Sequence, residues 1–171
     1  MKHPYRKAIL SDLSAVMEII EDGRAFLKPQ GGGQWQDGYP KEENLRSDIE
    51  QGHLYAMLDE KGKVSAVAAF TYYEKDYDTL YEGKWLTDLP YIVMHRIATK
   101  SSKRGEGFGD DLFKLFEEVA KKEGYRSLRI DTHENNVIMR HLLEKNGFIF
   151  CGRAILTPNK DRMVFEKVLN S

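Results

Sequence analysis

The residues best suited to chemistry lie in the segment Lys100–Gly109, which combines basic side chains with closely spaced glycines. The glycines are at positions 105, 107 and 109, and the cations are Lys100, Lys103 and Arg104. Glycine leaves backbone N–H groups uncovered. The amphipathic segment that follows predicts a helix whose first turn has free N–H donors and a partial positive charge. The segment therefore predicts a binding site for a phosphate or pyrophosphate group.

Two common phosphate-binding patterns do not fit this segment. The Walker A pattern ends in Gly-Lys-Ser/Thr, whereas Gly107 is followed by Phe-Gly-Asp. The dinucleotide pattern GxGxxG needs its third glycine at position 110, which is Asp110. The pattern that fits is Arg-x-x-Gly-x-Gly, from Arg104 to Gly109, between a predicted strand and a predicted helix. The alternative is a glycine-rich strand-to-helix connection that holds no ligand.

Length and composition describe an ordinary globular chain. Its 171 residues are 41% hydrophobic and 31% charged, which suits one folded domain over residues 1–171. The net charge of −1 gives no basic field for nucleic acid or an anionic membrane. Cys151 is the only cysteine, so no intrachain disulfide can form. The N-terminus lacks a signal-peptide pattern and no window is long enough to span a membrane, so we expect a cytoplasmic protein.

Apolar periodicity predicts, in order, a strand, two helices, three strands, a helix, a strand, a helix and two strands. The predicted strands are Tyr5–Leu10, Leu54–Leu58, Val64–Tyr73, Tyr91–Thr99, Ser127–Thr132, Phe148–Leu156 and Met163–Leu169. The predicted helices run from Ser11 to about Gly23, from Pro40 to Gly52, from the glycine segment to about Gly124, and from Glu134 to Asn146. The step from Tyr91–Thr99 through its crossover helix to Ser127–Thr132 is predicted to be parallel. The expected fold class is α+β, with a central mixed sheet of about seven strands and helices on both faces.

Two stretches lie outside this pattern. Residues 29–40 are rich in glycine, and we expect a mobile loop in which Trp35 and Tyr39 form an aromatic contact surface. The alternative is a loop whose aromatic side chains simply pack on the core. Residues 74–90 are polar and aromatic, and they are also predicted to form a loop.

A second motif follows the glycine segment in the sequence, between Asn136 and Phe148. Asn136 lies seven residues before Leu143, and Lys145-Asn-Gly-Phe148 follows. Together with Arg-x-x-Gly-x-Gly, this pattern resembles the GNAT superfamily of N-acetyltransferases, whose members commonly show an asparagine, a tyrosine seven residues later, and Lys-x-Gly-Phe. The order of the predicted elements also resembles that fold along essentially the whole chain. The resemblance therefore implies a GNAT-like acyl-CoA N-acyltransferase fold.

The resemblance also implies acetyl-CoA as the acetyl donor. The resemblance implies that backbone groups of Ile97 and Thr99 pair with the pantetheine arm, at the point where two parallel strands splay apart. The loop Arg104–Asp110 wraps the pyrophosphate, and Asn136 hydrogen-bonds the pantetheine amide region. The alternative for Asn136 is a residue that only caps its helix. The implied donor-binding set is Ile97, Ala98, Thr99, Lys103, Arg104, Gly105, Gly107, Phe108, Gly109, Asp110 and Asn136.

One position departs from the family pattern. Relatives commonly use the tyrosine as the acid that protonates the departing CoA thiolate, but this chain has Leu143 there. Leucine cannot donate a proton, so the role is filled elsewhere or is absent. A thiol has a pKa of roughly 8.5, so a thiolate can leave unassisted near neutral pH.

A base is also needed, because an amine acceptor is mostly an ammonium ion at pH 7. His95 has the best intrinsic pKa for this role and shares a strand face with Ile97. The alternative is a core or interstrand histidine. The rival bases are a chain of waters or the side chains of Glu74, Asp131 and His133. We expect the backbone N–H of Ile97 to hold the oxyanion.

Two other kinds of chemistry find little support in the sequence. No histidine or acidic spacing predicts a metal site, so no metal is expected. Cys151 falls in a late predicted strand, outside the glycine segment, which argues against a cysteine nucleophile and an acyl-enzyme.

The sequence analysis therefore predicts an N-acetyltransferase that moves the acetyl group of acetyl-CoA by direct attack. We expect the acceptor to be a primary amine of a small molecule, because residues 29–40 could wall off a small pocket. The expected acceptor-binding residues are Trp35, Tyr39, Tyr72 and Glu74. The alternatives are acetylation of a protein N-terminus or lysine, and a non-catalytic acyl-CoA-binding module. A homodimer is implied only by the resemblance.

Overall fold

The computed structural model describes residues 1–170, which divide into two compact units. The first unit contains residues 1–70 and 95–115, and the second contains residues 71–94 and 116–170. The expectation of a single domain over residues 1–171 stays a prediction. Within the described residues, no helix is long and apolar enough to cross a membrane.

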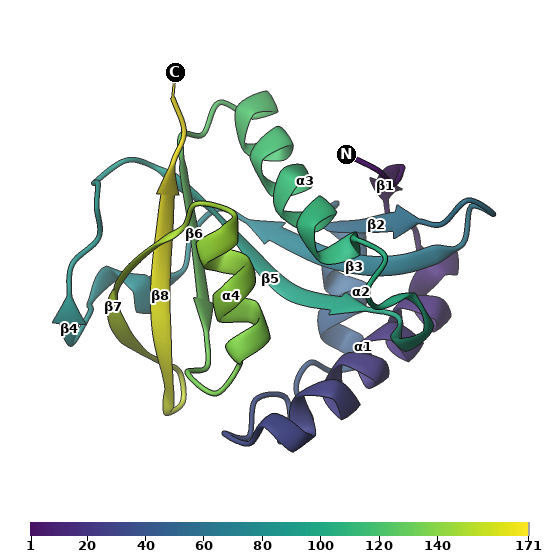
Figure 1. The fold of residues 1–171 in the computed structure, drawn as a ribbon, viewed down its shortest axis with the longest axis horizontal. Coiled ribbons are helices and arrows are strands. Elements are labelled where there is room, and N and C mark those ends of the chain that lie inside the picture. Colours follow the sequence, from purple (N-terminus) through teal and green to yellow (C-terminus); the bar gives the residue numbers. More distant parts are fainter. Residues whose placement is uncertain (171) are drawn as a thin grey trace. The chain divides into compact units, whose positions relative to one another are not determined.

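The chain runs through one strand, two helices, four strands, a helix, a strand, a helix and two strands, as labelled in Figure 1. The strands are β1 (Tyr5–Lys7), β2 (Leu54–Leu58), β3 (Val64–Thr71), β4 (Glu82–Gly83), β5 (Tyr91–Thr99), β6 (Ser127–Thr132), β7 (Ile149–Leu156) and β8 (Lys160–Val168). The helices are α1 (Leu13–Leu27), α2 (Glu42–Glu50), α3 (Phe108–Lys122) and α4 (Val137–Lys145). Short 3-10 turns occur at Leu10–Asp12, Lys28–Gln30, Lys75–Asp78 and Ser101–Lys103.

The strands form one sheet in the order β1-β2-β3-β5-β6-β8-β7-β4. β5 and β6 run parallel, as the crossover predicts, whereas β1–β2, β2–β3, β4–β7, β6–β8 and β7–β8 pair antiparallel. The mixed sheet confirms the predicted fold class. The sheet has eight strands rather than about seven, because residues 74–90 contain β4 as well as a 3-10 turn.

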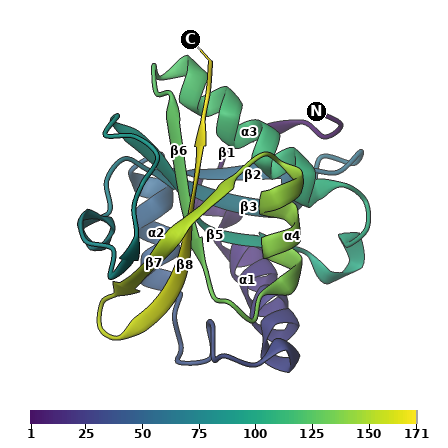
Figure 2. The same cartoon turned by 60° about the vertical axis from the view of Figure 1, so that its left-hand side comes forward.

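In the first unit, β3 is buried on both faces. Val67 and Ala69 belong to a core shared with α1 and α2. The alternating residues Ala66, Ala68 and Phe70 are equally buried on the other face. Figures 1 and 2 show α1 and the start of α3 on opposite sides of β2 and β3. A strand covered on both faces reads as a continuous apolar run, which is how this segment of the sequence reads.

In the second unit, a buried carboxylate ties the segment before β5 to the sheet. Glu166 on β8 is fully buried and accepts hydrogen bonds from the Leu86 N–H at 2.8 Å and the Thr87 hydroxyl at 2.7 Å. It also accepts one from the Ser127 hydroxyl at 2.6 Å. A buried carboxylate with this many donors is satisfied. Part of the segment predicted to be a loop is therefore held in place by β6 and β8.

Candidate active site

The strand β5 changes its pairing in the middle. Its parallel ladder with β6 covers only Tyr91–Val93, opposite Ser127–Arg129. Three residues beyond the ladder, Arg96 has φ of 51°, in the left-handed region that side chains other than glycine rarely adopt. A left-handed residue inside a strand redirects the peptide groups next to it, as in a β-bulge. The backbone around Ile97 therefore does not continue the regular ladder.

The segment after β5 contains the predicted phosphate loop. A 3-10 turn at Ser101–Lys103 leads into Gly105 and Gly107, which have φ of 83° and 88°, and α3 begins at Phe108. These left-handed glycines expose successive backbone N–H groups directly before a helix N-terminus. The order strand, glycine loop and helix is therefore as predicted, and the geometry suits an anion.

Two acidic side chains fix the start of this loop. The Ser101 N–H donates to the Asp22 carboxylate on α1 at 2.8 Å. The ammonium of Lys103 lies 3.4 Å from the Asp59 carboxylate. Both contacts join residues that are far apart in the sequence, and local patterns give no sign of either. The loop is thus attached to the rest of the first unit on two sides.

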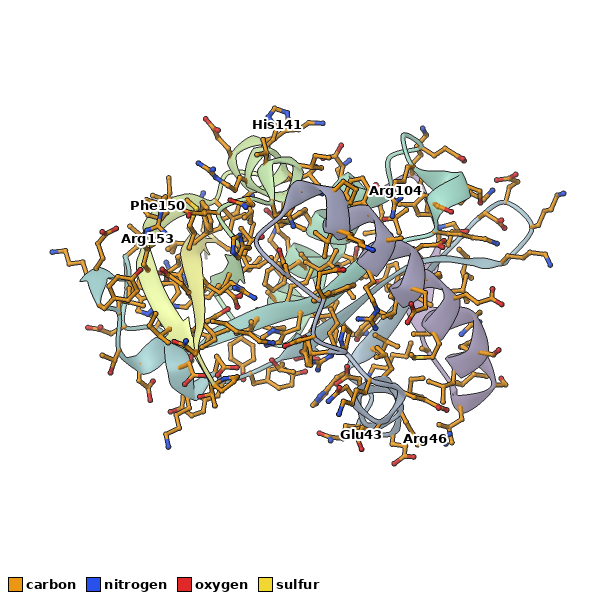
Figure 3. The ribbon with its side chains drawn as sticks, turned by 90° about the horizontal axis from the view of Figure 1, so that it is seen from below. Glu43, Arg46, Arg104, His141, Phe150 and Arg153 are labelled. Atoms are coloured by element: carbon orange, nitrogen blue, oxygen red, sulfur yellow. The ribbon has the colours of Figure 1, made fainter. Side chains whose placement is uncertain are left out.

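Arg104 lies against α1 in Figure 3. Its Nη2 donates to the carbonyl of Asp22 at 3.2 Å and to that of Thr99 at 3.3 Å. Its guanidinium stacks over the ring of Phe26, 4.0 Å from the centroid. Partial burial lowers the pKa of Arg104, although arginine remains a cation at neutral pH. Arg104 therefore both supports the loop and carries positive charge beside it.

The N-terminal segment packs on the first turn of α3. The carboxylate of Asp111 accepts hydrogen bonds from the backbone N–H groups of Lys2 and His3, at 2.9 and 2.8 Å, and lies 2.8 Å from the His3 ring. The His3 ring stacks on Phe108, with 3.7 Å between centroids. Sequence reasoning missed these contacts, because Asp111 reads only as an acidic residue in a helix first turn.

The loop 29–40 packs on the core through Trp35. The Trp35 side chain is 9% exposed, and a Cβ added at Gly23 would lie 2.9 Å from its ring. Arg24 donates to the carbonyls of Trp35, Tyr39 and Pro40, at 2.8, 2.9 and 3.1 Å. The exposed aromatic surface expected for Trp35 is therefore wrong, and the alternative of core packing describes it. Whether Trp35 and Tyr39 contact an acceptor stays a prediction.

A buried ion pair joins this loop, α2 and β5. Arg96 donates from Nε and Nη2 to the two oxygens of Asp48, at 2.5 and 2.7 Å, and from Nη1 to the Tyr39 hydroxyl at 2.6 Å. The Arg96 and Asp48 side chains are only 14% and 7% exposed. We call Arg96, Asp48 and Tyr39 the Arg96 clamp. Sequence reasoning missed it, because nothing local pairs residues that are 48 positions apart.

His95 is the residue before the clamp. Burial, and then the positive charge of Arg96, lower its pKa from 6.5 to about 3. The imidazole is therefore neutral at pH 7, but its conjugate acid would be strong and the ring a weak proton acceptor. The prediction that His95 is the base remains open, and this pKa weakens it.

In the second unit, Asn136 lies at the N-terminus of α4. Its Oδ1 accepts a hydrogen bond from the Met139 N–H at 3.1 Å, so it caps the helix. The cap uses the side-chain oxygen, and the predicted hydrogen bond to pantetheine stays a prediction. Leu143, on the same helix, is 0% exposed. The usual tyrosine position is therefore occupied by a core residue.

The rival bases, also in the second unit, have different environments. The Glu74 carboxylate accepts a hydrogen bond from the Asp76 N–H at 3.2 Å and caps a 3-10 turn. Asp131 accepts a hydrogen bond from the Tyr77 hydroxyl at 2.6 Å, and burial raises its pKa. Burial lowers the pKa of His133. Asp131 is thus the rival whose pKa moves toward neutrality, the direction that suits a base.

Two further side chains bear on the chemistry of the second unit. Tyr72, predicted to contact the acceptor, stacks on Tyr125 with 5.5 Å between ring centroids. Cys151 is buried on β7, and burial raises the pKa of its thiol. A buried thiol with a raised pKa is a poor nucleophile. The absence of an acyl-enzyme on Cys151 stays a prediction.

Comparisons with known proteins agree with this geometry. The family described as "Acetyltransferase (GNAT) family" matches residues 20–148. A GNAT-family acetyltransferase from Streptococcus agalactiae is 32% identical, over 99% of this chain and 96% of its own, with a TM-score of 0.88. The comparison with curated proteins gave no match.

Two more distant structures share the fold. A phosphinothricin acetyltransferase from Sinorhizobium meliloti, in complex with AcCoA, is 17% identical over 99% of this chain and 90% of its own, with a TM-score of 0.71. The PaiA N-acetyltransferase from Thermoplasma acidophilum, in complex with coenzyme A, is 16% identical over 98% of this chain and 99% of its own, with a TM-score of 0.70.

Proposed function

The chain belongs to the GNAT family of acetyltransferases, and we propose that it moves the acetyl group of acetyl-CoA to a primary amine of a small molecule. The observation that carries this proposal is the glycine loop. Gly105 and Gly107 present backbone N–H groups at the start of α3, and Arg104 adds a cation beside them. A pyrophosphate is the ligand that such a loop suits. The complexes of the Sinorhizobium and Thermoplasma enzymes with AcCoA and coenzyme A support the same donor.

The proposed reaction is direct transfer. The amine nitrogen attacks the thioester carbonyl carbon, the carbonyl oxygen becomes an oxyanion, and the C–S bond then breaks to release CoA as a thiolate. The backbone N–H of Ile97, next to the left-handed Arg96, is proposed to hold the oxyanion. The buried Leu143 offers no proton, so the thiolate leaves without an acid at that position.

The ammonium form of the acceptor must lose a proton to a base. His95, with its pKa lowered to about 3, is a weak acceptor of that proton. Burial raises the pKa of Asp131, which brings this carboxyl closer to the pH at which a base works best. The base is therefore proposed to be a water chain or one of the rival side chains, Glu74, Asp131 or His133, ahead of His95.

A small acceptor is favoured by the fixed loop 35–40. Arg24 binds three of its carbonyls, Trp35 packs in the core and the Tyr39 hydroxyl joins the Arg96 clamp. A loop held at this many points forms a rigid wall. Rigid walls suit a compact ligand better than an extended peptide that needs an open groove.

The test is a panel of small primary amines and peptides with acetyl-CoA, in which the released CoA thiol is measured. We expect turnover with members of the small-amine set, and little with peptides that carry a free N-terminus or lysine. Faster turnover with peptides would contradict the acceptor class. Absence of CoA release from the whole panel, with acetyl-CoA bound, would favour a non-catalytic acyl-CoA-binding module.

A further inference from the structure

The Arg96 clamp raises a question that the proposed reaction does not answer. Arg96 is one of two residues other than glycine with positive φ in the described chain, and the conformation is uncommon for a long side chain. Strained backbone persists only where its surroundings hold it. Here the guanidinium makes a two-point contact with Asp48 and a third contact with Tyr39, all at 2.7 Å or less.

The partners of Arg96 come from two separate elements. Asp48 lies on α2, and Tyr39 lies in the loop that Arg24 holds through the carbonyl of Tyr39 itself. Each partner is fixed independently of β5. A planar guanidinium that binds a carboxylate through two N–H groups has little freedom to rotate. The side chain therefore limits the backbone rotations that Arg96 can make.

From this geometry we propose that Asp48 and Tyr39 are positioning residues for acetyl transfer. They hold Arg96 in its left-handed conformation, and this conformation directs the next N–H, that of Ile97, toward the thioester oxygen. The proposal rests on the proposed function, and it adds two residues that do not touch the reacting atoms. Removal of the Asp48 or Tyr39 contact should weaken the polarisation of the thioester carbonyl and leave the phosphate loop unchanged.

The test uses [1-¹³C]acetyl-CoA and needs no acceptor amine. The carbonyl ¹³C resonance of bound acetyl-CoA is compared with that of the free thioester, and its affinity is measured by isothermal titration. In the wild type we expect a downfield shift on binding, because a hydrogen bond polarises the carbonyl. In Asp48→Asn we expect this shift to fall, with the dissociation constant changed by less than about twofold.

Two further variants separate positioning from general support. In Asp48→Asn combined with Arg96→Gly, we expect the shift to return in part, because glycine adopts positive φ without a clamp. In Asp12→Asn, the matched control, a similar Arg–Asp pair is broken, in which Arg6 donates to Asp12 at 2.7 and 3.0 Å. This control should keep the full shift. If Asp48→Asn does not fold, Tyr39→Phe, which removes one contact, carries the test with a smaller loss of shift.

The outcomes are distinct. An unchanged carbonyl shift in folded Asp48→Asn or Tyr39→Phe would overturn the inference and leave the proposed function intact. Binding of acetyl-CoA to the wild type with no downfield shift would overturn the inference and the proposed role of the Ile97 N–H, and it would leave the assignment of acetyl-CoA as the donor intact. Failure of the wild type to bind acetyl-CoA would overturn the proposed function and the inference together.

Discussion

Among single residues, Arg104 combines support of the loop with charge, and its replacement should show both effects. Removal of its side chain deletes hydrogen bonds to two carbonyls and the stacking on Phe26. Each net hydrogen bond contributes on the order of 1 kcal/mol. The lost charge acts on a bound pyrophosphate through an interaction that salt screens.

We therefore predict that Arg104→Ala lowers the affinity for acetyl-CoA by about tenfold at low salt, equivalent to about 1.4 kcal/mol, and by less at high salt. Arg104→Lys, the matched control, keeps the charge and should retain more affinity. Titration calorimetry at two ionic strengths measures both. Equal losses at low and high salt would show that Arg104 only supports the structure.

His95 leads to a prediction about stability. Because burial and the charge of Arg96 lower its pKa to about 3, the folded protein keeps it neutral where the unfolded chain takes up a proton. The contribution of neutral His95 to the free energy of unfolding is complete above pH 6.5, and it is lost as the pH falls from 6.5 toward 3. The slope is up to about 1.4 kcal/mol per pH unit.

Urea unfolding at pH 7, 6 and 5 tests this expectation. His95→Asn should lose less free energy of unfolding between pH 7 and 5 than the wild type loses. His141→Asn is the control, because His141 is exposed on α4 (Figure 3). Parallel curves for the wild type and His95→Asn would contradict the lowered pKa.

Among the elements, α1 shows how tertiary packing changes a local pattern. Gly23 predicts a helix end, but α1 continues to Leu27. Close packing explains why position 23 is a glycine. A Cβ there would lie 2.9 Å from the Trp35 ring and 3.2 Å from the Ala98 Cβ. Gly23 therefore lies inside the helix because a side chain would not fit there. The Trp35 ring packs against this glycine, beside β5.

Gly23→Ala should consequently destabilise the protein, although glycine to alanine inside a helix normally stabilises by roughly 0.5–1 kcal/mol. Overpacking costs roughly 1–3 kcal/mol, so we expect a net loss of about 1 kcal/mol. Chemical denaturation measures it. In a Trp35→Phe background, which removes the larger ring, the same substitution should cost less. A gain in stability in the wild-type background would refute the packing argument.

Sequence reasoning reaches the elements whose signals are local. The strand β5, the glycine loop and α3 follow from an apolar run, from glycines and from helical spacing. β4 is missed because two residues, Glu82 and Gly83, pair with β7 and carry no periodic pattern. The Arg96 clamp is missed because its partners are distant in sequence. Asn136 is found by the family pattern, and the helix cap that the sequence offered as its alternative is present in the structure.

For the whole molecule, the absence of an acid at position 143 should appear in the pH–rate profile. We predict that kcat/KM rises with pH to a plateau through one apparent pKa, that of the base or of the free amine. A steep fall above neutral pH would reveal a protonated group that assists the thiolate. Because Leu143 is fully buried, Leu143→Tyr would overpack the core and is not a clean test.

The same profile tests direct transfer. Cys151→Ala should keep the wild-type rate and pH dependence, because the thiol is buried and burial raises its pKa. Loss of activity in Cys151→Ala, with acetyl-CoA binding intact, would indicate an acyl-enzyme. The measurement needs one amine from the panel that supports turnover.

The central claim is that the loop before α3 binds the pyrophosphate of acetyl-CoA, and titration of acetyl-CoA into two glycine variants tests it most directly. Gly107 and Gly124 have similar φ, 88° and 82°. A Cβ added at Gly124 meets no atom within 4 Å, and one added at Gly107 meets only Lys2 Cδ at 3.9 Å and His3 Cε1 at 4.0 Å, so valine strains the backbone alike at both positions. We predict that Gly107→Val weakens binding at least about tenfold, since its side chain covers the N–H groups of the loop, whereas Gly124→Val, beyond the opposite end of α3, binds as the wild type does. Equal affinities in the two folded variants would contradict the assignment of the loop.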